Sequence, residues 1–93
     1  MTFGPNNLKS YVCVHVFLHE RGTRLVVHDS DGDWAFACGH EDHSERDWRV
    51  VGVGHLTDED PSLHDCADLP VGYEAERIER GAVWARRAIK ASP

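Results

Sequence analysis

Cysteine and histidine side chains in the middle of the sequence could bind a metal ion. The run CGHEDH from Cys38 to His43 offers one thiol and two imidazoles, which are donor types that zinc prefers. A structural zinc site needs four ligands, and His55, or the pair His64 and Cys66, could complete the set. The spacings match no established zinc signature, and the alternative is a buried thiol beside two solvated histidines. The zinc ligands predicted from this run are Cys38, His40, His43 and His55.

A second metal candidate involves two histidines on neighbouring predicted strands. His15 lies in the run YVCVHVFLH and His28 in the run RLVVH, and a turn near Arg21-Gly22 would place them opposite each other. Cys13 lies on the same strand face as His15. Such a cluster could hold zinc or copper. The alternative is a pair of neutral imidazoles partly covered by their apolar neighbours.

The acidic run from Asp29 to Asp33 superficially resembles a calcium-binding loop. Such a loop requires a glycine after its third acidic residue and a glutamate at its twelfth position. Here Gly32 precedes the third acid, and the twelfth position is His40. Asp31-Gly32 is a favoured two-residue hairpin turn, so the run predicts a turn and not a calcium site.

The sequence contains no arrangement that is typical of an enzyme. Cys66 and His64 are two residues apart on a predicted short helix, where such positions do not face each other. Cys13 and His15 share a predicted strand face, two residues apart. A glycine-rich phosphate loop, a GxSxG motif and an HExxH motif are absent. This favours a binding role over catalysis.

The charge balance narrows the choice of partner. Sixteen acidic residues against ten lysines and arginines give a net charge of −6 at neutral pH. This charge repels nucleic acid and anionic membrane surfaces and favours a basic protein partner. The alternative for the acidic segment near residue 60 is helix capping and a solvated face. The predicted partner-binding residues are Asp58, Glu59, Asp60 and Asp65.

The length of 93 residues fits one domain. We expect a loose lead-in over residues 1–10 and a single domain over residues 11–93. No apolar run approaches the ~20 residues of a membrane span, and the first residues do not resemble a signal peptide. The three cysteines form no CxxC motif, which indicates reduced thiols. The expected location is therefore the cytoplasm.

Hydrophobic periodicity predicts strands over residues 11–19, 24–29, 34–38 and 49–54. Asp60-Pro61 predicts the start of a short helix over residues 61–67. Apolar residues from Ala75 to Ile89 recur with helical spacing, although Tyr73 to Glu76 also alternates like a strand.

A hairpin turn at Asp31-Gly32 would pair Val27 with Phe36 and Leu25 with Cys38. A turn at Arg21-Gly22 would pair the first two predicted strands so that one apolar face extends across the first three strands. The opposite face of the predicted sheet is half apolar. A homodimer joined through this face would be compatible with both a protein-binding and a zinc-binding function. The predicted core is Val14, Val16, Leu18, Leu25, Val27, Trp34, Phe36, Val51, Val53 and Leu63.

Three short motifs carry a family resemblance over about residues 24–80. They are GDWAFACG from Gly32 to Gly39, DPSL from Asp60, and LPVG from Leu69, the last followed by Ala75 and Arg77. With these motifs the chain resembles small bacterial proteins of unknown function and, more distantly, immunity-protein-like domains encoded beside bacterial toxins. The resemblance implies an α+β domain, a strand over residues 72–78 and a toxin-neutralising role. It brings no catalytic residues.

These observations predict a small single α+β domain, an antiparallel sheet with one or two short helices. Residues 72–78 are predicted as a strand, and residues 82–91 are left open between strand and helix. The predicted function is that of a non-enzymatic binding module that presents an acidic surface to a protein partner, and the resemblance implies an immunity-protein-like role for it. The alternative is a small zinc-binding protein that uses cysteine and histidine ligands.

Overall fold

The structure is a computed structural model that describes residues 3–5, 7–39 and 47–89. In these segments six strands form one mixed, mostly antiparallel sheet in the order β4-β1-β3-β2-β5-β6, which confirms the predicted α+β class. β1 and β3 are parallel, whereas every other neighbouring pair is antiparallel. In chain order the elements are β1 (Lys9–Cys13), α1 (Val14–Phe17), β2 (Leu25–His28), β3 (Trp34–Ala37), β4 (Trp48–Gly52), α2 (Val53–Glu59), the 3-10 helix η2 (Pro61–Cys66), β5 (Tyr73–Glu76) and β6 (Ala85–Ala88).

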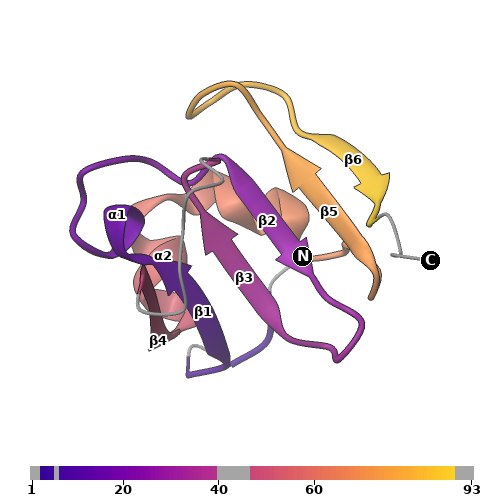
Figure 1. Ribbon diagram of the computed structural model, residues 1–93, viewed down its shortest axis with the longest axis horizontal. Helices are drawn as coiled ribbons and strands as arrows, with labels where there is room; N and C mark the ends of the chain where they lie inside the picture. Colours follow the sequence, from indigo (N-terminus) through magenta and orange to yellow (C-terminus); the bar gives the residue numbers. More distant parts are fainter. Residues whose placement is uncertain (1–2, 6, 40–46, 90–93) are drawn as a thin grey trace.

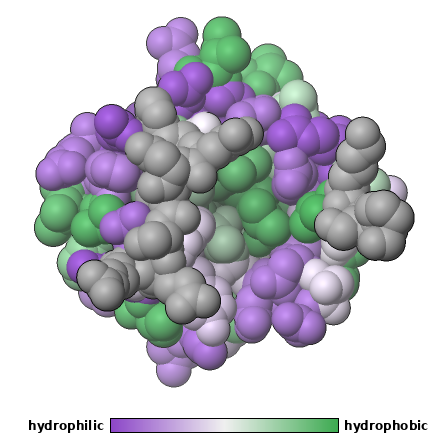
Figure 2. Space-filling model, viewed as in Figure 1, coloured by the Kyte–Doolittle hydropathy of each residue, from purple (hydrophilic) through white to green (hydrophobic). Residues whose placement is uncertain are grey.

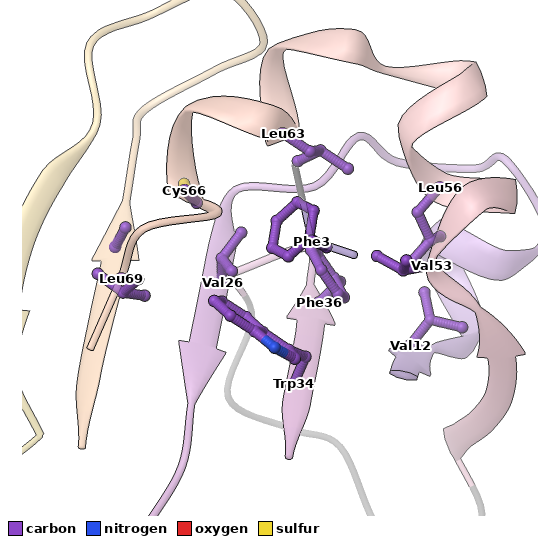
Figure 3. Close-up of a cluster of buried hydrophobic side chains, with 11 residues drawn as sticks. Phe3, Val12, Val26, Trp34, Phe36, Val53, Leu56, Leu63, Cys66 and Leu69 are labelled. Atoms are coloured by element: carbon purple, nitrogen blue, oxygen red, sulfur yellow. The ribbon is translucent and has the colours of Figure 1, made fainter. Parts of the chain in front are cut away.

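The helices α2 and η2 cover one face of the sheet, and α1 lies beside the end of β1 (Figure 1). The main core fills the space between that face and the two helices, with Phe3 near its centre (Figure 3). The opposite face shows apolar residues near its middle and hydrophilic residues around them (Figure 2). The core residues are Phe3, Val12, Val26, Trp34, Phe36, Val53, Leu56, Leu63, Cys66, Leu69 and Ala75.

The hairpin between β2 and β3 differs from the prediction by one residue. Val26, and not Val27, lies opposite Phe36, and Leu25 lies opposite Ala37. The loop has three residues because Asp29 pairs with Asp33 through a 3.0 Å backbone hydrogen bond, and Gly32 adopts the left-handed conformation that such loops favour. A shift of one residue exchanges the two faces of a strand. Val26 is therefore fully buried under the helices.

The predicted strand over residues 11–19 is wrong beyond Cys13. The chain turns into α1 at Val14, and His19, with a φ of 60°, follows the helical turn. β3 lies between β1 and β2, so the predicted antiparallel pairing of the first two strands does not form. The start of the chain also differs from a loose lead-in, because Phe3 is buried in the core and β1 begins at Lys9.

The second half of the chain follows the predictions more closely. β4 lies within the predicted strand except for its first residue, Trp48, but ends at Gly52 because the unpredicted helix α2 begins at Val53. η2 confirms the predicted short helix, with Asp60 accepting a hydrogen bond from the Ser62 amide at 3.2 Å. β5 confirms the strand within residues 72–78. The segment left open contains β6, antiparallel to β5, so the helical spacing was misleading there.

Four predicted core residues, Trp34, Phe36, Val53 and Leu63, are buried. Leu18 is 54% exposed, which contradicts its place in the core, because it follows α1. The other predicted core residues are only partly buried, and they are Val14, Val16, Leu25, Val27 and Val51. Among the described residues, no helix has the length and apolarity needed to span a membrane.

Candidate metal centre

Three metal-binding side chains converge where β1 and β3 end. One donor atom each from Cys13, His15 and Cys38 lies within 4.8 Å of the other two. Cys13 is the last residue of β1, and Cys38 directly follows β3. Because these strands are parallel neighbours, their carboxyl ends lie at the same edge of the sheet. The turn into α1 then brings His15 to the two sulfur atoms.

The spacing of Cys38 and His15 fits a tetrahedral zinc ion. The Cys38 sulfur lies 3.7 Å from His15 Nδ1. Zinc–sulfur and zinc–nitrogen bonds at a tetrahedral angle separate the two donor atoms by about 3.6 Å. Both thiols are fully buried, and His15 is partly exposed. The three residues therefore need little rearrangement to bind one ion.

Among the described residues, apolar side chains and the guanidinium of Arg21 surround the sulfur atoms. Burial raises the pKa of the Cys13 thiol, and backbone hydrogen bonds from Val16 and Cys38 offset only part of this effect. Cys13 is therefore a protonated thiol at neutral pH, and metal binding has to displace its proton. Arg21 Nη1 donates a hydrogen bond to the Cys38 sulfur at 3.7 Å. Two thiolates neutralise a divalent ion, so a bound Zn²⁺ would not repel this guanidinium.

The predicted ligand sets are only partly brought together. Cys38 belongs to the three-donor group, whereas His40 and His43 lie outside the described residues. His55 is exposed on α2 and is not part of that group. His64 and Cys66 lie on η2, also outside the group, and burial raises the pKa of Cys66 to about 12.

The predicted pairing of His15 with His28 is wrong. The His28 ring stacks on Trp34 at 3.9 Å, and its Nδ1 donates to the Leu69 carbonyl oxygen at 2.7 Å. His28 therefore links β2 to the chain after η2. Cys13 and His15 were predicted on one face of a single strand, and they do meet. They meet because the chain bends into a helix between them, and the sequence pattern did not predict this bend.

The acidic turn between β2 and β3 is the other group of three potential ligands in the described segments. The Asp29 carboxylate accepts hydrogen bonds from the amides of Asp31 and Asp33, at 2.9 and 3.1 Å. These bonds stabilise the hairpin loop, as expected for aspartate in turns. The turn predicted from this run is thus confirmed, although its loop is one residue longer.

The predicted partner-binding acids occupy different environments. Asp58, Glu59 and Asp65 are exposed, whereas Asp60 is buried and forms an ion pair with Arg77 at 2.6 Å. Glu59 accepts a hydrogen bond from His19 at 2.6 Å. Asp60 therefore has an internal partner, and three acids can face the solvent.

Arg77 is the centre of a buried polar cluster that the sequence did not predict. Its guanidinium donates to the Thr23 carbonyl oxygen at 2.9 and 3.1 Å, to Ser62 Oγ at 2.8 Å and to Asp60. It also lies 4.1 Å from the centre of the Trp84 ring. We call these four residues, Thr23, Asp60, Ser62 and Arg77, the Arg77 network.

Asp60 is ionised within this network although it is buried. Burial opposes its charge, but hydrogen bonds from Ser62 and Arg77 and the charges of Arg77 and Arg80 outweigh that cost. The pKa of Asp60 therefore lies below its ordinary value.

Comparisons with protein-family models, curated proteins and solved structures find no match for this chain.

Proposed function

We propose that this protein is a small metal-binding module that holds a zinc-like ion between Cys13, His15 and Cys38. The convergence of the three donor atoms within 4.8 Å supports this function. The donor set of two thiolates and one imidazole suits zinc and other soft ions better than magnesium or calcium.

Three protein ligands leave a fourth tetrahedral position for water or another ligand. Sets of two cysteines and one histidine occur in zinc enzymes, where the fourth position is open. The proposal is limited to binding, because the described residues at the centre include no carboxylate that could act as a base.

Metal binding would connect three elements of the fold. Cys13 ends β1, His15 belongs to α1, and Cys38 follows β3. An ion bound to all three holds the helical turn against the sheet edge. Since the unfolded chain does not bring these residues together, binding adds to the stability of the folded state.

The test is a titration of the reduced protein with Co²⁺, followed by displacement with Zn²⁺. Cobalt bound to thiolates shows a charge-transfer absorption in the near ultraviolet, which reports sulfur ligation directly. We expect one ion per chain, loss of the absorption in Cys38→Ala and its retention in Cys66→Ala. Cys66 is the matched control, because it is equally buried and lies outside the group.

The histidine is tested by His15→Gln, with His55→Gln as its control. We expect the first variant to weaken cobalt binding and the second to leave it unchanged. Native mass spectrometry of the same samples gives the metal content and shows whether the chain associates with itself. A wild-type protein without the sulfur absorption, or equal binding by Cys38→Ala and Cys66→Ala, would exclude this centre.

The pH dependence provides a further readout. A thiol that binds as thiolate releases one proton, so binding through two protonated thiols raises the apparent affinity about 100-fold per pH unit. We expect this slope between pH 7 and pH 8. A slope near zero would contradict thiolate ligation.

A second candidate function is capture of a basic protein partner. It is favoured by the exposed residues Asp58, near the end of α2, and Asp65, near the end of η2, and by the net charge of −6. A toxin-neutralising role would be one form of it. We expect specific capture from lysate at low salt, lost in Asp58→Asn/Asp65→Asn. Recovery of the same proteins by both forms would count against these residues.

A further inference from the structure

A cleft of about 690 Å³ lies between α1, the edge strand β4 and α2. Its apolar walls include Phe17 and Val50, which are 42% and 59% exposed. Val16, Val51 and Leu56 complete the apolar part. This volume is within the range of small-molecule sites, which combine apolar walls with a few polar groups.

The charged groups of the cleft are not balanced. Asp60 is neutralised by Arg77, whose guanidinium lies 2.6 Å away, and Glu59 receives a hydrogen bond from His19. Arg80 and Arg21 line the same cleft. Within the described residues, Arg80 contacts the already paired Asp60, at 3.7 Å, and the backbone oxygen of Glu59, at 2.7 Å.

Among the described residues, three guanidinium groups, those of Arg21, Arg77 and Arg80, therefore face only two carboxylates, those of Glu59 and Asp60. This part of the chain leaves one surplus positive charge at the cleft, in a protein with a net charge of −6.

We propose that this cleft binds a small organic anion, a monocarboxylate with a short hydrocarbon chain. Its carboxylate pairs with the arginines, and its hydrocarbon part covers the exposed surfaces of Phe17 and Val50. This removes apolar surface from water and supplies the negative charge that the cleft lacks. Arg21 also contacts the Cys38 sulfur, whereas Arg80 belongs to the cleft alone, so the inference does not require a bound metal ion.

The test compares three ligands with the same eight-carbon chain: octanoate, octanol and octyltrimethylammonium. Binding is followed by calorimetry and by amide chemical-shift changes in the full-length protein. We expect saturable binding of octanoate, with shifts at Phe17, Val50 and Leu56. Octanol should bind about tenfold more weakly, which is the factor that one charge-assisted hydrogen bond supplies. Equal binding of all three ligands, or no saturation, would overturn the proposal.

Two matched pairs of variants locate the site. Val50→Glu adds a negative charge inside the cleft, and Val83→Glu adds the same charge at a 90% exposed position outside it. Arg80→Gln and Arg87→Gln each remove one exposed arginine, inside and outside the cleft. We expect about tenfold weaker octanoate binding in the first member of each pair and no change in the second.

Circular dichroism spectra verify that all four variants are folded. The same loss of binding in both members of a pair would show that only the overall charge matters. No loss in either member would place octanoate elsewhere. Either outcome rejects the cleft as the binding site.

Discussion

Arg77 and Cys13 are both buried near the end of a strand, but their surroundings use them differently. Every guanidinium nitrogen of Arg77 has an oxygen partner between 2.6 and 3.1 Å away. The Cys13–His15–Cys38 centre contains sulfur contacts of 3.7 Å instead. In one region every guanidinium nitrogen is hydrogen-bonded to oxygen, and the other region gathers soft donors within 4.8 Å of one another.

This difference separates a structural cluster from a candidate site. A buried guanidinium that is paired with a carboxylate and hydrogen-bonded through all three nitrogens supports the fold. Soft donors that converge within 4.8 Å can share one metal ion. The following predictions test this division, beginning with the largest effect.

Asp60→Asn should cause the largest loss of stability, about 3 to 5 kcal/mol at pH 7. The substitution leaves the fully buried Arg77 side chain without its anionic partner. Urea unfolding followed by tryptophan fluorescence measures the loss. Asp58→Asn is the control, because Asp58 is exposed, and its effect should stay within about 0.5 kcal/mol.

The stability loss in Asp60→Asn should depend on pH in a direction that the pKa of Asp60 determines. The pKa of Asp60 is lowered in the folded state, so its ionised form stabilises the protein above the unfolded-state pKa of about 3.9. That contribution is lost as the pH falls through the folded-state pKa. The difference between wild type and Asp60→Asn should therefore be constant from pH 7 to about pH 5 and shrink below pH 4. A difference that grows on acidification would contradict an ionised Asp60.

Local sequence signals predicted part of this region. Asp60 followed by Pro61 marks a helix start, and the structure confirms it because the cap needs only neighbouring residues. The partner of Asp60 is 17 positions away, on the chain after β5. No local pattern in the sequence indicates that the Arg77 side chain is buried. The pairing depends on how β5 joins the sheet.

Zinc binding at the Cys13–His15–Cys38 centre should give the second largest effect on stability. At a free zinc concentration 100-fold above the dissociation constant, a bound ion stabilises the folded state by about 2.7 kcal/mol. We expect this gain in the wild type and in Cys66→Ala and its absence in Cys38→Ala. Thermal unfolding with and without a chelator measures it. A gain of equal size in all three proteins would place the ion away from Cys38.

Substitutions on β2 test which side of the sheet carries the main core. Val26→Ala should cost about 2 kcal/mol, because Val26 is fully buried under α2 and η2. Val27→Ala should cost less than about 1 kcal/mol, since Val27 is only partly buried on the opposite face. The register predicted from a two-residue turn requires the opposite order. Denaturant titrations of the two variants decide between the registers.

The three candidate metal ligands show why the site was only partly predictable from the sequence. The types of residue were informative, since Cys13, His15 and Cys38 all belonged to predicted metal candidates. Their grouping was wrong because it depends on a three-residue loop and on the helical turn after Cys13. β-branched residues at 14 and 16 favour a strand locally, and packing against the sheet outweighs that preference. Long-range pairing of β1 with β3 then brings Cys38 to the other two ligands.

Glu59→Gln should have the smallest effect, although Glu59 and Asp60 are adjacent in the sequence. Each carboxylate lies 2.6 Å from a basic side chain, His19 for Glu59 and Arg77 for Asp60. The Glu59 and His19 side chains are 50% and 64% exposed, so water and salt screen their attraction. We expect a loss of no more than about 0.5 kcal/mol, vanishing in 1 M NaCl, in the urea titration used for Asp60→Asn. If Glu59→Gln cost as much as Asp60→Asn, burial would not be what distinguishes the Arg77 network from the surface.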